Sequence, residues 1–150
     1  MNPAHRGSLA VLLLRLVTGV AFLFHGWSKI QNPFHWLDGA PNAPPGILQA
    51  VAAVAEFGGG IGLIVGLLTP LWAAGIFCTM AYAIAFHVMK GDPFVGKGGP
   101  SYELALLYLS VSVALVLIGP GRYSLDQVIA RRTTGATPNQ LRDSLNARLR

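Results

Sequence analysis

The chain has 150 residues, of which 53% are hydrophobic and only 11% are charged, with a mean hydropathy of +0.52. Such values exclude an ordinary soluble protein and are typical of a polytopic membrane protein. The formal net charge is +5, but most of the arginines follow the last apolar segment, which indicates membrane topology and not nucleic-acid binding. The single cysteine, Cys78, excludes an internal disulfide and a cysteine-ligated metal site.

The first apolar segment, about residues 9–30, is long enough to cross a bilayer, which takes about 20 apolar residues. Its polar groups recur at steps of three and four and therefore lie on one helix face with Phe22: Arg15, Thr18, His25 and Lys29. A charged side chain at the bilayer centre costs on the order of a few kcal/mol. This face is therefore expected to point at protein or water, and the other segments have to supply its partners.

Two further apolar segments follow a loop that is rich in proline and glycine, and they predict helices over about 47–68 and 71–89. The turn between these helices is short enough to require an antiparallel hairpin. Gly58, Gly62 and Gly66 recur every four residues, a spacing that lets membrane helices pack closely. The second helix is therefore expected to form a tight seam with a neighbour.

The last apolar segment predicts a helix over about 101–118, which is slightly short for a span and implies tilt or local bilayer thinning. Ser124 can cap a short helix that ends near Arg132. Farther on, over 137–149, leucines recur every four residues on the side of the predicted helix opposite the arginines. Such a segment lies on anionic headgroups or stays solvated.

The predicted fold is all-α: a polytopic four-transmembrane-helix bundle over residues 1–126, followed by a basic amphipathic tail over 127–150. Four spans return the chain to the side where it began. Because the arginines gather after the last span, the positive-inside rule places both termini in the cytoplasm.

This topology brings ionisable groups from all four helices into the outer half of the bilayer: His25, Lys29, Glu56, His87, Lys90 and Glu103. Each of them alone would be costly, so they are expected to meet. One interpretation is a structural set of ion pairs, such as Glu56 with Lys29 and Glu103 with Lys90. The other is an outward-opening polar pocket that binds a ligand or passes protons, with Glu56 as the titrating group.

Two alternatives place a metal at these residues. His25 and His87 would ligate haem through their ring nitrogens, or both histidines and two glutamates would hold a divalent cation. Spacing across helices does not follow from sequence, so no metal ligand is assigned and haem is the less favoured cofactor. Arg15 lies in the inner half, where it would snorkel or pair with a backbone carbonyl beside Thr18 and Gly19.

In combination, these motifs resemble those of the DoxX family of small bacterial four-helix membrane proteins. The resemblance covers about residues 9–126 and leaves the arginine-rich tail outside. It lies in Arg15-x3-Gly19-x2-Phe22-x2-His25-Gly26-x2-Lys29, Glu56-Phe57-x-Gly59-Gly60, Gly66-x2-Thr69, His87, Tyr102-Glu103-Leu104 and the closing Gly119-Pro120-Gly121-Arg122-Tyr123-Ser124-Leu125-Asp126. It implies the bacterial inner membrane and an association with quinone-linked oxidoreduction.

The leading hypothesis is therefore a membrane subunit or small enzyme of quinone-linked redox chemistry. Glu56, His25 and Glu103 are the candidate catalytic residues, and the candidate ligand-binding residues are Arg15, Lys29, His87 and Tyr102. In this hypothesis His25 and Lys29 bond the quinone oxygens, while the two glutamates move protons. No flavin or nucleotide fingerprint appears, so the electrons would come from a bound cofactor, a thiol-bearing partner or the substrate.

Two other hypotheses need no catalysis in this chain. One is a transport or binding module for a small solute or for protons. The other is a scaffold that uses the glycine seam and the basic tail to hold a redox partner. The expected partners are membrane lipid, a membrane or soluble redox protein, and further copies of the chain or subunits of a complex.

Overall fold

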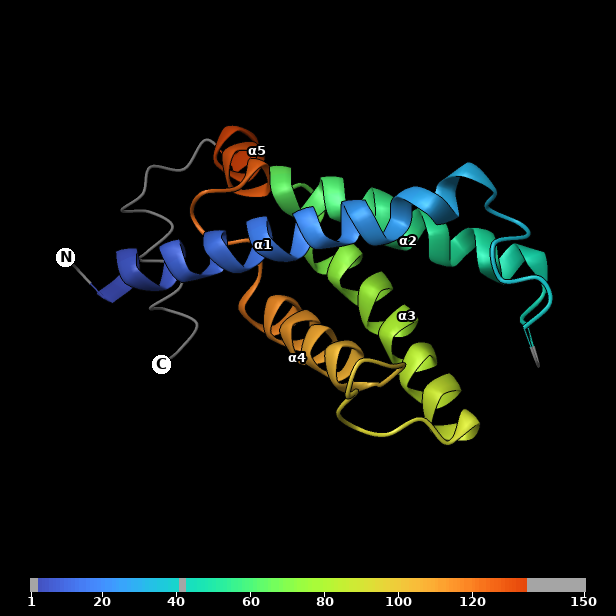
Figure 1. Cartoon of the computed structure of the whole chain (residues 1–150). Coiled ribbons are helices and arrows are strands. Elements are labelled where there is room, and N and C mark those ends of the chain that lie inside the picture. The colour runs from blue at the N-terminus through green and yellow to red at the C-terminus, as the bar shows by residue number, and fades with distance from the viewer. Residues whose placement is uncertain (1–2, 41–42, 135–150) are drawn as a thin grey trace, which may run out of the picture.

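The computed structural model describes residues 3–40 and 43–134, and within these ranges the regular structure is entirely helical (Figure 1). The helices are α1 (Pro3–Gln31), α2 (Gly46–Val65), α3 (Thr69–Lys90), α4 (Glu103–Ile118) and α5 (Leu125–Thr134). The first three are long and apolar enough to cross a membrane. The predicted all-α membrane fold is thus confirmed, while the amphipathic segment expected over 137–149 lies outside the described residues.

The fourth helix is the short one, as the sequence indicates. With 16 residues it is about 24 Å long at about 1.5 Å per residue. The apolar core of a bilayer is about 30 Å thick. A fourth span at this helix stays a prediction that requires tilt or a locally thinner bilayer.

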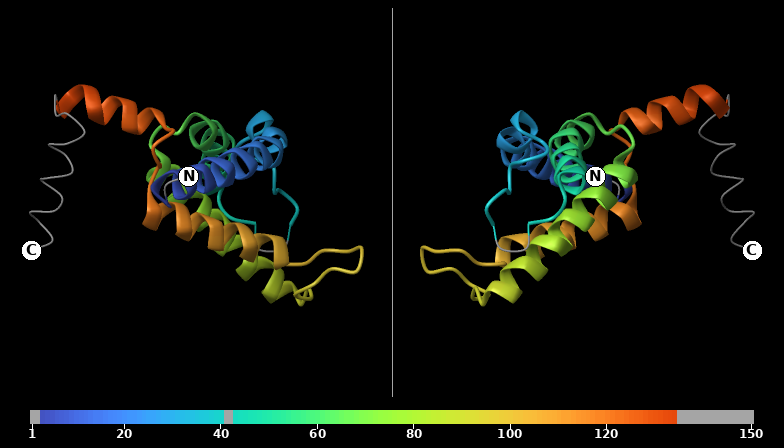
Figure 2. Two further views of the ribbon diagram at one scale, coloured as in Figure 1. Left: turned by 90° about the vertical axis from the view of Figure 1, so that its left-hand side faces the viewer. Right: turned by 90° about the vertical axis from the view of Figure 1, so that its right-hand side faces the viewer.

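The helices form two hairpins that diverge. α1 packs along α2, α3 packs along α4, and α2 joins the hairpins through its contact with α3, whereas α1 and α4 touch only sparingly. Figures 1 and 2 show the α3–α4 hairpin leading away from α1 and α2 toward the loop that joins α3 to α4. The architecture is therefore an open bundle.

Glycines set the close approach of the first two helices. A Cβ on Gly60 would lie 2.7 Å from the backbone nitrogen of Leu23, and one on Gly26 would lie 2.5 Å from that of Phe57. The expected glycine seam exists, but its closest backbone approach is made by these residues and Gly19. Two of the glycines in the four-residue repeat, Gly58 and Gly62, instead receive the indole ring of Trp72 from α3.

Arg15 is 1% exposed, and within the described part of the chain its guanidinium donates to four backbone carbonyls. Its guanidinium bonds the oxygens of Leu63 (2.9 Å) and Ile64 (3.2 Å) in the last turn of α2. It also bonds those of Pro120 (2.8 Å) and Tyr123 (2.9 Å), which lie between α4 and α5. Because the carbonyls of a last helical turn lack intrahelical partners, the arginine supplies what the helix end needs. The predicted pairing of Arg15 with backbone carbonyls is confirmed.

The segment after α4 also caps two other helices. The Asp126 carboxylate accepts hydrogen bonds from the backbone N–H groups of Leu68 (2.7 Å) and Thr69 (3.0 Å) at the start of α3. A carboxylate is favourable there because helix N-termini carry free N–H groups and positive potential. Ser124 Oγ accepts a bond from the Gln127 N–H (3.2 Å) and so caps α5, as predicted.

Gly66 tests this arrangement, because its left-handed φ of 74° ends α2 and a Cβ there would collide with the Arg15 guanidinium. We expect Gly66→Ala to lower the midpoint of thermal unfolding more than Gly91→Ala does. The midpoints are measured in detergent by circular dichroism at 222 nm. Gly91 ends α3 with a φ of 80° and has no atom within 4 Å of such a Cβ. Both variants share the left-handed strain of about 1–2 kcal/mol. Equal midpoints would show that the contact with Arg15 contributes nothing.

Candidate functional site

A pocket of about 540 Å³ opens between α2 and α3, beside the loop that joins α1 to α2. Its walls are mostly apolar, and a few polar side chains reach it: Lys29, Gln49, Glu56, Thr79 and His87. The two helices are close near their connecting turn, where Trp72 sits against the α2 glycines, and the pocket lies where they diverge. An apolar cavity of this size with a few convergent polar groups is the usual form of a small-molecule site.

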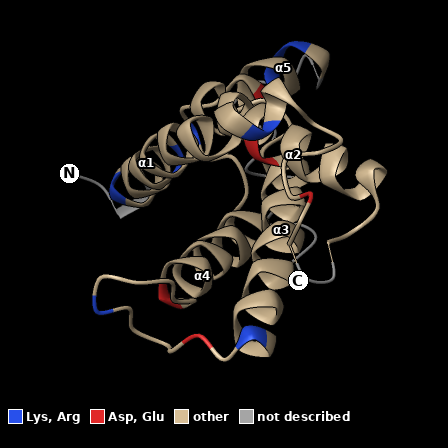
Figure 3. Ribbon diagram, turned by 45° about the vertical axis from the view of Figure 1, so that its right-hand side comes forward, with Lys and Arg blue, Asp and Glu red and all other residues tan. Residues whose placement is uncertain are grey.

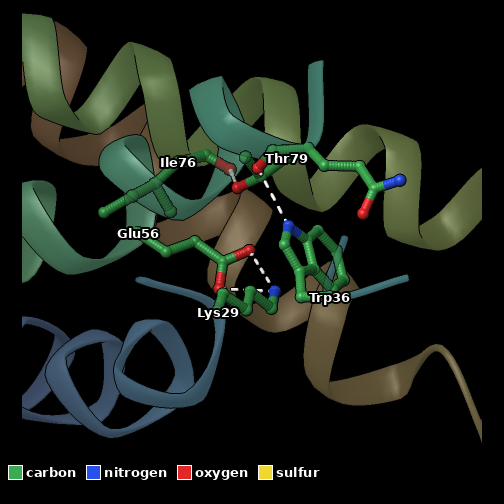
Figure 4. A network of polar contacts seen from close by, with 6 residues as sticks. Lys29, Trp36, Glu56, Ile76 and Thr79 are labelled. Carbon is green, nitrogen blue, oxygen red and sulfur yellow. Dashed lines mark hydrogen bonds and ion pairs between the residues drawn. The ribbon is translucent and has the colours of Figure 1, made fainter. Parts of the chain in front are cut away.

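A partly buried ion pair forms part of the pocket wall (Figure 4). Lys29 Nζ lies 2.6 and 2.7 Å from the two carboxylate oxygens of Glu56, whose side chain is 3% exposed. The same ammonium lies 4.4 Å from the centroid of the Trp36 ring, in cation–π geometry. The predicted pairing of Glu56 with Lys29 is confirmed, and it leaves this part of the pocket formally neutral.

Local structure explains why the pair is so short. Lys29 lies in the last turn of α1, where a helix favours a cation. Glu56 projects from the middle of α2 toward that turn, and the close packing at Gly26 brings the two backbones together. The pair therefore depends on the glycine contact between α1 and α2.

Gln49 holds the neighbouring loop in place. Its side-chain oxygen accepts a bond from the Leu37 N–H (2.9 Å), and its amide donates to the Pro44 carbonyl (3.0 Å) and to Asp38 (3.2 Å). Its backbone oxygen accepts the indole N–H of Trp36 at 2.9 Å. Gln49 thus fixes the ring that covers Lys29. Gln49 is not among the predicted site residues, although an amide seven positions before Glu56 in an apolar helix is a detectable signal.

Asp38 reinforces the same loop from outside the membrane-spanning helices. Hydrogen bonds from His35 (2.8 Å) and then from Gln49 hold the pKa of its carboxyl below the usual range. A lowered folded-state pKa favours the folded loop above the ordinary aspartate pKa, and this contribution is lost as the pH falls through the folded value. The carboxylate is therefore ionised at neutral pH.

His87 contributes a third ionisable group to the pocket, from the last turn of α3. Its Nδ1 lies 2.7 Å from Asp92 in the following loop. Nearer the middle of α3, the Thr79 hydroxyl donates to the carbonyl of Ile76 at 2.9 Å (Figure 4). Lys29, Glu56 and His87 are thus the predicted site residues that the structure brings together.

The other predicted site residues lie elsewhere. His25 is exposed on the α4 side of α1, with its ring centroid 6.1 Å from that of Tyr108. Tyr102 packs on Phe94 at 5.4 Å, and Glu103 is an exposed residue at the start of α4. Arg15 lies at the opposite end of the bundle, among the four backbone carbonyls that accept its hydrogen bonds, a group of contacts called here the arginine cage. The expected single cluster is divided because the α3–α4 hairpin diverges from α1.

The same separation of the hairpins bears on the second expected ion pair and on the two metal alternatives. Within residues 3–40 and 43–134, no ion pair joins Glu103 to Lys90, and both side chains are exposed. His87 lines the pocket and His25 does not, so the two histidines do not share it. In the same ranges no three His, Cys, Asp or Glu side chains are close enough together to hold a metal ion.

Comparison with known proteins gives a family and several relatives. The family model described as DoxX matches residues 10–89, which include Lys29, Glu56 and His87 of the pocket. An "Uncharacterized protein" of Haemophilus influenzae is 38% identical over 117 residues, covering 75% of this chain and 85% of that protein. No solved structure gives a significant match.

Two further relatives carry more informative names. "Putative oxidoreductase CatD" of Bacillus subtilis is 31% identical over 123 residues, which are 81% of this chain and 87% of CatD. "Inner membrane protein YqjF" of Escherichia coli is 26% identical over 133 residues, which are 83% of this chain and 95% of YqjF. The chain is thus similar to nearly the whole length of proteins named for the membrane and for redox chemistry.

The ion pair makes an asymmetric prediction. Lys29→Met leaves the Glu56 carboxylate unpaired at 3% exposure, whereas Glu56→Gln leaves an ammonium that is 22% exposed and partly hydrated. Breaking a fully buried pair costs about 3–5 kcal/mol, and the partial exposure of Lys29 lowers the cost here. We therefore expect Lys29→Met to lower the thermal midpoint more than Glu56→Gln, and the double variant to lose less than the sum.

Lys97→Met serves as the control, because Lys97 is an exposed loop residue. Midpoints measured by circular dichroism in one detergent allow the four variants to be compared directly. Strictly additive losses would show that the two charges are not coupled.

Proposed function

The chain belongs to the DoxX family of membrane proteins, and we propose that its pocket between α2 and α3 binds a lipid-soluble quinone for oxidoreduction. The observation that carries the proposal is the Lys29–Glu56 pair, partly buried in the wall of an apolar cavity of about 540 Å³. Ionisable groups held inside a membrane protein are costly and are retained where they serve a function. Here the pair offers hydrogen-bonding groups to a ligand whose body is apolar.

The pocket's surroundings favour a ligand that arrives through lipid. Leu48, Val51 and Tyr82 line it and are exposed on the outer surface of α2 and α3. On a membrane-spanning helix such an exposed apolar face points at acyl chains, so the pocket is accessible from the bilayer. Trp36 and Phe86 add aromatic surface against which a flat ring can pack.

The chemistry assigned to the pair is proton handling and polarisation. Reduction of a quinone to its hydroquinone takes two electrons and two protons, with each carbonyl oxygen becoming a hydroxyl. The Lys29 ammonium would donate a hydrogen bond to one carbonyl oxygen as negative charge develops there. Glu56, a carboxylate in the pair, would take up a proton from the aqueous side, where His87 and Asp92 lie, and pass it to that oxygen. The second proton would reach the other oxygen from the same aqueous side.

The electrons would come from a redox partner, because these residues offer acid–base groups and no electron carrier. The relative CatD, whose name assigns it provisionally to the oxidoreductases, supports this class of reaction. The name of YqjF supports the bacterial inner membrane as the location. In this proposal the chain is the quinone-binding membrane subunit of an oxidoreductase.

Quinone binding can be measured through the only cysteine, because Cys78 lines the pocket. In detergent micelles, a short-chain ubiquinone should slow alkylation of Cys78 by N-ethylmaleimide in a saturable manner. A hydrogen bond to a charged group contributes about 1.5–3 kcal/mol, so we expect Lys29→Met to raise the apparent Kd about tenfold or more.

Lys97→Met should leave the apparent Kd unchanged, since Lys97 lies in the loop between α3 and α4 and does not line the pocket. Protection that is equal in both lysine variants would overturn the role of the ion pair. A complete lack of protection in the unaltered protein would overturn the quinone pocket itself.

We also propose that both termini lie in the cytoplasm. Arg6, near the start of α1, and Arg131 and Arg132, on α5, lie at one end of the bundle. The positive-inside rule places such an end in the cytoplasm. Lys97→Cys, made together with Cys78→Ser, should react in intact cells with a membrane-impermeant maleimide. Arg131→Cys in the same background should react only after permeabilisation, and the reverse result would invert the topology.

A further inference from the structure

A second pocket lies at the opposite end of the molecule from the Lys29–Glu56 pair. It has a volume of about 520 Å³ and opens between the start of α1 and the end of α4. Ala10, Val11, Leu14 and Ile118 form its apolar wall. Its polar end is formed by Ser8, Arg122 and Gln127, so the pocket changes from apolar to polar along its length.

The unequal lengths of two helices create this groove. α1 has 29 residues and α4 has 16, which are about 43 Å and about 24 Å at about 1.5 Å per residue. The chain leaves α4 at Gly119 while α1 continues toward the membrane surface, so part of α1 has no α4 beside it. In a bilayer, an apolar helix face with no protein beside it is covered by acyl chains, which are as apolar as leucine.

Charge at this end favours an anionic ligand. The Arg122 side chain is exposed and makes no hydrogen bond or ion pair with the described residues. The one carboxylate at this end, within the described ranges, is Asp126, and its two oxygens accept the backbone N–H groups of Leu68 and Thr69. Figure 3 shows basic residues at the start of α1 and on α5, whereas the turn between α3 and α4 carries both signs.

We propose that this groove binds one anionic phospholipid, with the phosphate at Arg122 and an acyl chain along Val11, Leu14 and Ile118. Basic pockets between membrane helices bind anionic headgroups, because the guanidinium supplies charge and paired donors to phosphate oxygens. A lipid satisfies both ends of the groove, since its headgroup meets the arginine and its chain covers the apolar wall. The site is independent of the quinone pocket and of any redox activity.

The test is native mass spectrometry of the full chain, titrated in detergent with phosphatidylglycerol or with phosphatidylcholine of the same chains. We expect a single phosphatidylglycerol to bind at least about fivefold more tightly than phosphatidylcholine, and Arg122→Gln to remove this preference. Arg131→Gln is the matched control, because Arg131 is an exposed arginine on α5 that does not line the groove. The control should keep the preference.

A second pair of variants tests the apolar wall. Ala10→Phe should lower the binding of both lipids by filling the groove, whereas Ala74→Phe, at an exposed alanine of α3 outside both pockets, should not. Inorganic phosphate is the third probe, and it should fail to displace the lipid.

Three results would overturn the proposal. Equal loss of preference in Arg122→Gln and Arg131→Gln would indicate diffuse surface attraction. Equal binding of the two lipids by the unaltered protein would remove the role of the headgroup. Displacement by millimolar phosphate, with Ala10→Phe silent, would make the arginine a free-anion site.

Discussion

The fold depends on one buried arginine and the carbonyls that surround it. Arg15 links α1 to the end of α2 and to the segment after α4, and its partners are 48 to 108 positions away in sequence. In lipid, both an unpaired guanidinium and unpaired carbonyls are costly, so neither side is stable without the other. The same segment then caps α3 through Asp126. One end of the bundle is thereby closed by polar contacts, while the other end is free to open.

That opening determines where the candidate site lies. The two hairpins diverge away from the arginine cage, and the pocket between α2 and α3 appears where they separate. The glycine contact of α1 with α2 keeps Lys29 against Glu56, and the loop fixed by Gln49 keeps the Trp36 ring over the ammonium. The bundle is therefore held together by the arginine cage at one end, while the two hairpins separate at the other end and leave room for the pocket.

Sequence reasoning succeeded where a charge in an apolar helix has few choices of partner. Arg15 required carbonyls and Glu56 required a cation, and the structure supplies both. It failed to foresee the divergence of the hairpins, because interhelical angles depend on side-chain packing, such as Trp72 against Gly62, that a linear pattern does not encode. The predicted meeting of His25 and Glu103 with the pocket was lost for that reason. The ligand-binding roles of Lys29 and His87 stay predictions.

The arginine cage also bears on how the protein is made. Chains emerge N-terminus first, so α1 reaches the membrane while Pro120 and Tyr123, which supply half of the cage bonds, are still about a hundred residues from synthesis. Until then the Arg15 charge lacks half of its final acceptors, and a chain that stops early never gains them. Arg15 in α1 therefore gains its full set of acceptors only after the segment that follows α4 has been synthesised. A product truncated before Pro120 would therefore carry a poorly paired charge within the membrane, which is costly.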